Sequence, residues 1–482
     1  MKLKHACLST SIVFIFSGAA IPSYAQTAQD FEQMRAEIKR LSEQLNQLTK
    51  AKSAAPQQDL VDRIEQVELS SKDAVVAGDI PGSFRLPNSE TSVHLYGFGE
   101  LNWVHEMRGD NSSNDYSTFL AYAPLRGVAA GPNDPSIPAN KTGRDYLTAR
   151  TSRFGIETST PSSYGPISIK VEGDFNNDPR TGNSAVSGTA ANIYTQQSTN
   201  SYNFRLREAY GQFNGFLIGQ TWSTFMDVDN APETVDFNGP IGSTFIRQPQ
   251  IRYSYPTKDF GKFSVALENS VSYVLDRTGA VDTNGFSHVP DLVGRWDKTF
   301  DWGAVSLRGV TQDNRVNDGA GASLSRRGYG LAASGTYKTW GDDSMNWAIT
   351  GGTGIGRYFN YIEGAFFDDV NHKLLLEKVV GVVLGYQHKP SATLRFNGSI
   401  GFQRNFNNDY TAFAMANGLG SGNGALGNFA INRELLQSHL GFIWNPVANV
   451  DIGAEYIFGR RKTLADETAY MSRVDLSAKY HF

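Results

Sequence analysis

The final nine residues of the chain alternate strictly between apolar and polar side chains. One face of the resulting strand is apolar and consists of Val474, Leu476, Ala478, Tyr480 and Phe482. Soluble sheets keep their edge strands short or charged, so an apolar face that ends on an aromatic residue is more typical of a strand in lipid. The pattern predicts the closing strand of a membrane barrel, with Tyr480 and Phe482 as its assembly signal. An amphipathic strand of a soluble sandwich is the alternative.

The same two-residue period recurs from Val93 onward. Sixteen segments show it, and they begin near residues 93, 144, 166, 203, 216, 249, 262, 290, 303, 326, 345, 376, 392, 432, 449 and 470. No segment after the N-terminal leader approaches the 18 consecutive apolar residues of a membrane-spanning helix. We therefore expect an all-β transmembrane barrel of sixteen antiparallel strands, preceded by a short α-helical segment.

The connections between these segments alternate between short and long. Asn214-Gly215 and Asp301-Trp302 are short, whereas residues 107–143 and 404–431 are long. This alternation is typical of an up-and-down barrel with short turns in the periplasm and long loops outside the cell. Aromatic residues flank the short turns, as in the girdle at a membrane interface. A barrel of this size has room for an aqueous lumen.

The N-terminal region is expected to have three parts. Residues 1–25 resemble a secretory signal peptide, and they contain the only cysteine, Cys7, so no disulfide or thiolate ligand is expected in the mature chain. Residues 26–50 are expected to form a periplasmic coiled coil, with 51–90 as a flexible linker and 91–482 as the barrel. The apolar seam of the coiled coil is Phe31, Met34, Ile38, Leu41, Leu45 and Leu48. The seam either joins protomers or docks a single helix on its own domain.

The connection at about residues 225–248 is the candidate constriction loop. It is acidic and carries Asp227, Asp229, Glu233 and Asp236. In general porins of sixteen strands, the third outside loop folds into the lumen and needs basic partners on the wall. The alternation predicts inward arginines at Arg153, Arg205, Arg207, Arg252, Arg295, Arg308 and Arg395. Arginine is always protonated, and arginines around a lumen favour small anions. Alternatively, these arginines are solvated or paired with inward acids.

The alternation turns Glu208 outward, where it fits a contact between protomers better than lipid. No serine, histidine and aspartate set is spaced for nucleophilic catalysis, and no histidine pair has the spacing of a zinc helix. The charge of −4 is mild and does not indicate nucleic-acid binding. We therefore expect no enzyme activity, cofactor, resident metal or nucleic-acid partner.

Taken together, these features resemble the DcaP-like porins, which are trimeric outer-membrane channels with an N-terminal coiled coil. The likeness lies in the Phe31 to Leu48 seam, Val93–Asn102, Thr151–Ile156, Gly219–Phe225 and Ala478–Phe482. The resemblance implies a homotrimer in the outer membrane of a Gram-negative bacterium that passes small anionic solutes such as dicarboxylates. It also implies contacts with outer-membrane lipid, lipopolysaccharide and the barrel-assembly machinery.

The leading hypothesis is a passive channel that prefers small anions. Two alternatives stay open. One is a structural protein that anchors the cell wall and has little channel activity, and the other is a general non-selective porin.

Overall fold

The computed structural model describes Glu32 and residues 35–44, 76–109, 118–125, 142–176, 204–317 and 323–482. The chain divides into two compact units, Met1–Ala74 and Val75–Phe482. In the first unit, residues 35–44 are helical and leave Ile38 and Leu41 exposed. The other seam positions and the expected signal peptide lie outside the described residues, so the coiled coil stays a prediction. None of the described helices is long and apolar enough to cross a membrane.

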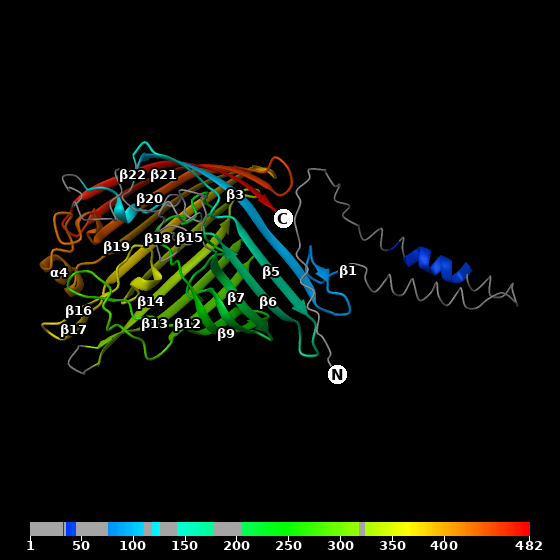
Figure 1. Cartoon of the computed structure of the whole chain (residues 1–482), viewed down its shortest axis with the longest axis horizontal. Coiled ribbons are helices and arrows are strands. Elements are labelled where there is room, and N and C mark those ends of the chain that lie inside the picture. The colour runs from blue at the N-terminus through cyan, green and yellow to red at the C-terminus, as the bar shows by residue number, and fades with distance from the viewer. Residues whose placement is uncertain are drawn as a thin grey trace, which may run out of the picture. The chain divides into compact units, whose positions relative to one another are not determined.

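The second unit is a closed antiparallel barrel of sixteen strands (Figure 1). In chain order the strands are β3 (Ser92–Arg108), β5 (Arg153–Thr160) with its short forerunner β4 (Asp145–Thr148), β6 (Ile167–Asp174), β7 (Arg205–Phe213), β8 (Phe216–Trp222), β9 (Arg247–Thr257), β10 (Gly261–Glu268), β12 (Asp291–Phe300), β13 (Gly303–Asn317), β14 (Ser323–Lys338), β15 (Ser344–Thr353), β18 (Lys378–Ser391), β19 (Leu394–Asn405), β20 (Asn432–Trp444), β21 (Val450–Thr463) and β22 (Thr468–His481). Each strand pairs with the next, and β22 pairs with β3 to close the sheet. The predicted fold class is confirmed.

Side chains alternate between the two faces of this wall. On β22, Leu476 and Tyr480 point outward and are exposed, whereas Arg473 and Asp475 point inward and are buried. The terminal Phe482 is also exposed on the outside. An apolar outer face and a polar inner face are what a barrel needs when lipid surrounds it and water or polar chain fills it.

A small hairpin completes the seam between the first and last barrel strands. Phe482 exchanges backbone hydrogen bonds with Gly97, so β22 leaves the start of β3 unpaired. The hairpin of β1 (Val76–Ala77) and β2 (Phe84–Arg85) covers this edge, with Phe84 opposite Val93. The prediction of a flexible linker over 51–90 is therefore wrong for residues 76–85. Paired strands form there because the open edge of β3 offers backbone partners.

The rim that carries the long connections contains structure that the sequence analysis treated as loop. β11 (Val274–Leu275), β16 (Ala365–Asp368) and β17 (Lys373–Leu375) form a separate three-stranded sheet. Helix α4 (Asp409–Ala416) packs nearby, and Leu275, Phe366 and Tyr410 share one buried apolar cluster. Figure 1 shows α4, β16 and β17 at one end of the barrel and β1 and the C-terminus at the other. We call these ends the long-loop rim and the short-turn rim.

One acidic side chain in this region is buried without a cation. Glu377 lies between β17 and β18, and the Gly356 N–H of the short helix η2 (Gly356–Tyr358) donates to one of its carboxyl oxygens. The other oxygen has no hydrogen-bond partner in the described structure. Burial raises the pKa of Glu377 to about 7, even though backbone N–H groups act in the opposite direction. The group therefore carries a proton in mildly acidic solution.

Candidate functional site

The connection between β8 and β9, residues 223–246, turns into the barrel and contacts its inner wall. We call it the inward segment. Its Asp227 Oδ1 lies 3.2 Å from Arg295 Nη2 on β12. Further along, the Asp236 N–H donates to Glu455 on β21 at 2.9 Å. The segment is thus attached to strands on widely separated parts of the circumference.

The first attachment involves Asp227 with two predicted arginines. Arg308 donates to the Phe225 carbonyl at 3.1 Å and to the Ser334 hydroxyl at 2.7 Å. Ser334 in turn donates a short hydrogen bond to Asp227. Burial alone would raise the pKa of Asp227, but Arg295, Ser334 and Arg308 together hold it below its ordinary value. Asp227 is therefore a carboxylate at neutral pH and is bound to the wall by charge.

The second attachment is a two-point contact between Glu233 and Arg395 of β19. Arg395 Nε donates to Glu233 Oε2 at 2.7 Å, and Nη2 donates to Oε1 at 2.9 Å. Asn397 and Gln387 add hydrogen bonds to the same carboxylate at 3.0 and 2.9 Å. Two parallel charge-assisted bonds fix both the position and the orientation of the acid.

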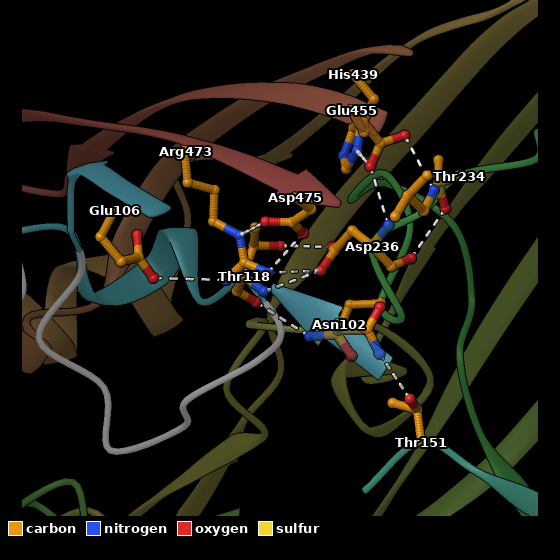
Figure 2. A network of polar contacts seen from close by, with 12 residues as sticks. Asn102, Glu106, Thr118, Thr151, Thr234, Asp236, His439, Glu455, Arg473 and Asp475 are labelled. Atoms are coloured by element: carbon orange, nitrogen blue, oxygen red, sulfur yellow. Dashed lines mark hydrogen bonds and ion pairs between the residues drawn. The ribbon is translucent and has the colours of Figure 1, made fainter. Parts of the chain in front are cut away.

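The third attachment is the buried polar network drawn in Figure 2. Arg473 of β22 lies 3.6 Å from Asp236 and 2.7 Å from Asp475, and the Thr118 hydroxyl donates to Asp236 at 2.8 Å. Glu455 accepts the Asp236 N–H and also contacts His439, with 3.1 Å between the Glu455 carboxylate and the imidazole. Arg473 is not among the arginines predicted from the sequence. It lies two residues before Asp475 on the inward face of the last strand, and this alternation is the pattern that could have identified it.

Glycines on the wall allow the backbone of the inward segment to approach closely. A Cβ added at Gly401 of β19 would overlap the Ile241 carbonyl oxygen, and one added at Gly381 of β18 would overlap that of Gly242. Nearby, Gln437 accepts a hydrogen bond from the Ile241 N–H at 3.2 Å. The segment therefore lies directly against the backbone of β18 and β19, because those positions lack side chains.

Four arginines gather on the opposite part of the wall, around β5, β7 and the start of β9. Arg207 binds Glu172 at 2.8 Å and Asp174 at 2.9 Å. Arg205 also binds Asp174, at 2.8 Å, and Arg153 lies 3.5 Å from Glu172. The fourth member, Arg247, makes no ion pair with any described residue. We call Arg153, Arg205, Arg207 and Arg247 the arginine cluster; its first three members contact Glu172 and Asp174.

Aromatic rings border this cluster. The Arg247 guanidinium lies 4.5 Å from the Trp222 ring centroid. Phe237 of the inward segment lies 5.6 Å from the Arg205 guanidinium and 5.7 Å from that of Arg207. A cavity of about 360 Å³ opens beside these residues, and its lining includes Arg153, Arg207, Trp222 and Phe237. The inward segment and the arginine cluster thus border the same open space.

Two predicted site residues stand apart from these contacts. Arg252 on β9 lies opposite Leu217 on the inner face, and it makes no ion pair with the described residues. Asp229 of the inward segment is exposed and makes no described hydrogen bond. Of the other predicted arginines, Arg295, Arg308 and Arg395 hold the inward segment. Arg153, Arg205 and Arg207 belong to the cluster.

The predicted orientation of Glu208 is wrong. A β-bulge shifts the register of β6 and β7, so that Glu172 lies opposite Glu208 and Gly173 opposite Leu206. Arg207 is the extra residue, and both it and Glu208 consequently point inward. Glu208 accepts a hydrogen bond from Thr221 at 2.9 Å and lies 3.2 Å from Lys170. Strict alternation cannot anticipate such a bulge.

Comparison with known proteins places the chain in a family. A model of the DcaP outer membrane protein family matches residues 126–482. The chain belongs to this family. The outer membrane channel DcaP of Acinetobacter baumannii is 24% identical, with a TM-score of 0.63 over 84% of this chain and 100% of that one. Members of this porin family are channels of the Gram-negative outer membrane rather than enzymes.

Two more distant structures are also similar to this family member. The anion-selective porin from Comamonas acidovorans is 16% identical, with a TM-score of 0.45 over 82% of this chain and 100% of that chain. OmpT of Vibrio cholerae is 12% identical, with a TM-score of 0.48 over 83% and 99%. No curated protein sequence matches the chain. Among the described residues, no group of three histidine, cysteine or acidic side chains is arranged to hold a metal ion.

Proposed function

We propose that this outer-membrane channel conducts passively and prefers small anionic solutes, with dicarboxylates as candidate substrates. The observation that carries the proposal is the arginine cluster, in which three guanidinium groups contact Glu172 and Asp174 and that of Arg247 makes no ion pair with a described residue. Within the cluster, four cations face two carboxylates, an excess of two positive charges. Arg153 and Arg207 line the cavity beside the inward segment, and the acids of its lining, Glu100, Glu233, Asp236 and Asp475, are each paired with a cation outside the cluster. A solute that passes Phe237 comes close to this excess charge.

The geometry of the cluster suits a planar carboxylate. Guanidinium groups offer paired N–H donors that match two carboxylate oxygens. Arg153 and Arg207 bring guanidinium groups to the cavity lining. Behind them, Nη1 of Arg247 is buried and has no hydrogen-bond partner in the described structure. Trp222 and Phe237 leave flat apolar surfaces beside these donors. A solute with carboxylates on an organic body can contact both kinds of surface without a dedicated binding cage, and the process needs no cofactor.

Reversal potentials in a salt gradient across a planar bilayer test this proposal. We expect appreciable conductance with chloride favoured over potassium. Equal permeability would indicate a general porin. A correctly folded barrel without conductance would favour a structural protein that anchors the cell wall.

We also propose a homotrimer in which the wall from β5 to β8 faces neighbouring copies. These strands contain 8, 8, 9 and 7 residues, whereas β18 to β22 contain between 12 and 14. A tilted strand needs about 9 to 11 residues to cross the hydrocarbon core. The short wall is therefore better covered by protein than by lipid.

Lipid-borne quenching tests the proposed trimer contact. A fluorophore attached to the Ile218→Cys variant on β8 should be shielded from a quencher carried on lipid tails, whereas one attached to the Ile400→Cys variant on β19 should be quenched. Ile218 and Ile400 are both exposed on the outer face of the isolated chain, so they form a matched pair. Equal quenching would argue against this contact. Unheated and boiled samples on a detergent gel report the oligomer independently.

The proposed orientation places the short-turn rim and the N-terminal segment in the periplasm and the long-loop rim outside the cell. Tyr480 and Phe482, both exposed at the end of the last strand, are the proposed contact with the barrel-assembly machinery. Protease added to intact cells should cut the long loops and spare an epitope tag inserted after residue 26. Cleavage of the tag in intact cells would reverse the orientation.

A further inference from the structure

On the outward face of β18 to β22, the side chains change from apolar to basic near the long-loop rim. On β19 the outward side chains are apolar up to Phe402, and on β21 they are apolar up to Phe458. The next outward residue is Arg404 on β19 and Arg460 on β21. Both point away from the lumen, so they take no part in the site described above.

These arginines belong to a row of cations across four neighbouring strands. Arg404 lies opposite Glu434 of β20, and Glu434 lies opposite Lys462 of β21, which places the three residues at one height on the wall. Lys378 begins β18 and stands at the same rim. We call Lys378, Arg404, Arg460 and Lys462 the cationic belt.

The belt is only partly neutralised. Glu434 lies 3.3 Å from Arg404 and 3.9 Å from Arg460, and it is the only carboxylate among the outward side chains of β18 to β22, which are described in full. Lys462 lies 2.8 Å from Asp466, which it shares with Arg433. The side chains of Arg404 and Arg460 are 44% and 41% exposed. They are therefore accessible to a ligand from outside the barrel.

The surroundings of the belt match an amphiphile better than a soluble ion. An aromatic ring stands among the cations, since Phe406 lies 5.6 Å from the Arg404 guanidinium and 5.9 Å from the Lys378 ammonium. Directly below the belt are exposed apolar side chains such as Ile400 and Tyr456. A lipid whose acyl chains pack against these apolar side chains would place its headgroup next to the cations.

We propose that the cationic belt binds the phosphate groups of a phosphorylated glycolipid in the leaflet at the long-loop rim. Arginine forks match phosphate oxygens in pairs, and lysine adds point charge. Basic side chains beside an apolar membrane surface are the usual recognition site for anionic lipid headgroups. This inference requires only that the barrel spans the membrane, and it does not depend on which solute the lumen prefers.

The test uses the folded full-length protein in detergent, titrated with a bis-phosphorylated, acylated glucosamine disaccharide. Bound lipid is counted by native mass spectrometry. One variant combines Arg404→Gln, Arg460→Gln and Lys462→Gln, and a second carries Glu434→Gln alone. The two variants change the charge of the same patch in opposite directions. Lys298→Gln, on the outward face of β12 near the short-turn rim, serves as the control.

The triple variant should bind the phosphorylated lipid on the order of 100-fold more weakly, because each of the three removed cations contributes a similar share of the binding free energy to an anionic headgroup. Glu434→Gln should bind it more tightly, a gain that a merely structural role of the ion pairs would not produce. Loss of the lipid phosphates should abolish the difference between wild type and the triple variant. Lys298→Gln should bind as wild type does.

Several results would overturn the proposal. One is that the triple variant binds the lipid as tightly as wild type does. Another is that Glu434→Gln binds it more weakly or equally, and this variant can be measured even if the triple variant does not fold. Saturation by millimolar inorganic phosphate without lipid would show that the belt recognises a soluble anion instead. Equal loss of binding in Lys298→Gln would show that general charge, and not this patch, decides.

Discussion

Neutralising the arginine cluster should reverse much of the proposed anion preference. Replacing Arg205 and Arg247 with glutamine leaves Arg153 and Arg207 to pair with Glu172 and Asp174, and the excess charge disappears. Arg207 retains its contacts with both acids, so we expect the wall to fold. The substitution therefore removes the contacts of Arg205 with Asp174 and changes the charge along the path, but it keeps the hydrogen bonds of Arg207 to both acids.

The expected magnitude follows from how close an ion in the path comes to the removed charges. Phe237 packs against the cluster, 5.6 and 5.7 Å from the guanidinium groups of Arg205 and Arg207, and we take about 6 Å as the distance of a passing ion from each removed charge. In a water-filled lumen, two charges at about 6 Å contribute roughly 1.4 kcal/mol. Screening at 0.1 M salt reduces this to roughly 0.8 kcal/mol. The effect has opposite sign for potassium, so the chloride-to-potassium permeability ratio should fall on the order of tenfold.

The assay is the reversal potential across a planar bilayer in a potassium chloride gradient. The matched control, Arg404→Gln with Arg460→Gln, removes two positive charges from the outer face of the same barrel. It should change the ratio by less than about twofold, because the wall and screening separate those residues from the path. An unchanged ratio in the cluster variant, or an equal change in the control, would refute the reasoning.

Three further predictions concern the inward segment and the long-loop rim. Glu233→Gln removes the charge that binds Arg395, so single-channel current should fluctuate more and average higher, whereas Asp229→Asn, at an exposed residue without described hydrogen bonds, should leave the trace unchanged. Gly401→Ala should displace the inward segment and lower the free energy of unfolding by about 1–3 kcal/mol, measured by denaturant titration. Gly398→Ala on the same strand should have little effect, because an added Cβ there makes only ordinary contacts. Glu377 has a folded pKa of about 7, above its ordinary value of 4.5, so the folded state retains a proton that the unfolded state loses as the pH rises. Stability should therefore be full below about pH 4.5 and fall by roughly 3 kcal/mol as the pH rises through 7; hydrogen exchange around residues 355–377 should report the loss, and Glu377→Gln should remove its pH dependence.

Much of this architecture follows from local pattern. The period of two locates the sixteen strands, because each strand must present apolar side chains to lipid and polar ones to the interior. The same period predicts an inward direction for six of the seven candidate arginines, whereas the phase of the strand that carries Arg153 is ambiguous in the sequence. It also contains the signal for Arg473, whose contact with Asp236 becomes evident only when β22 and the inward segment are brought together.

Other features depend on contacts that no local pattern encodes. The bulge at Arg207 arises from the register between two strands, and it reverses the side chain that follows. Arg247 begins β9, and alternation from the buried Gln248 and Gln250 assigns it to the other face, so the pattern does not predict its place beside Trp222. The sheet of β11, β16 and β17 joins residues about 90 positions apart through short segments that resemble ordinary loops. The hairpin before β3 forms because another strand leaves an edge open.

The pairing of β22 with β3 constrains the order in which the molecule can assemble. Leu476 lies opposite Trp103, so one partner of the pair is synthesised early and the other near the end of translation. Until the last strand is added, the growing sheet has two edge strands with unpaired backbone N–H and C=O groups. Each edge can pair with a strand of another chain. These edges must therefore be protected until after translation ends. A polypeptide that lacks the last strand would remain an open sheet whose edges are prone to aggregation.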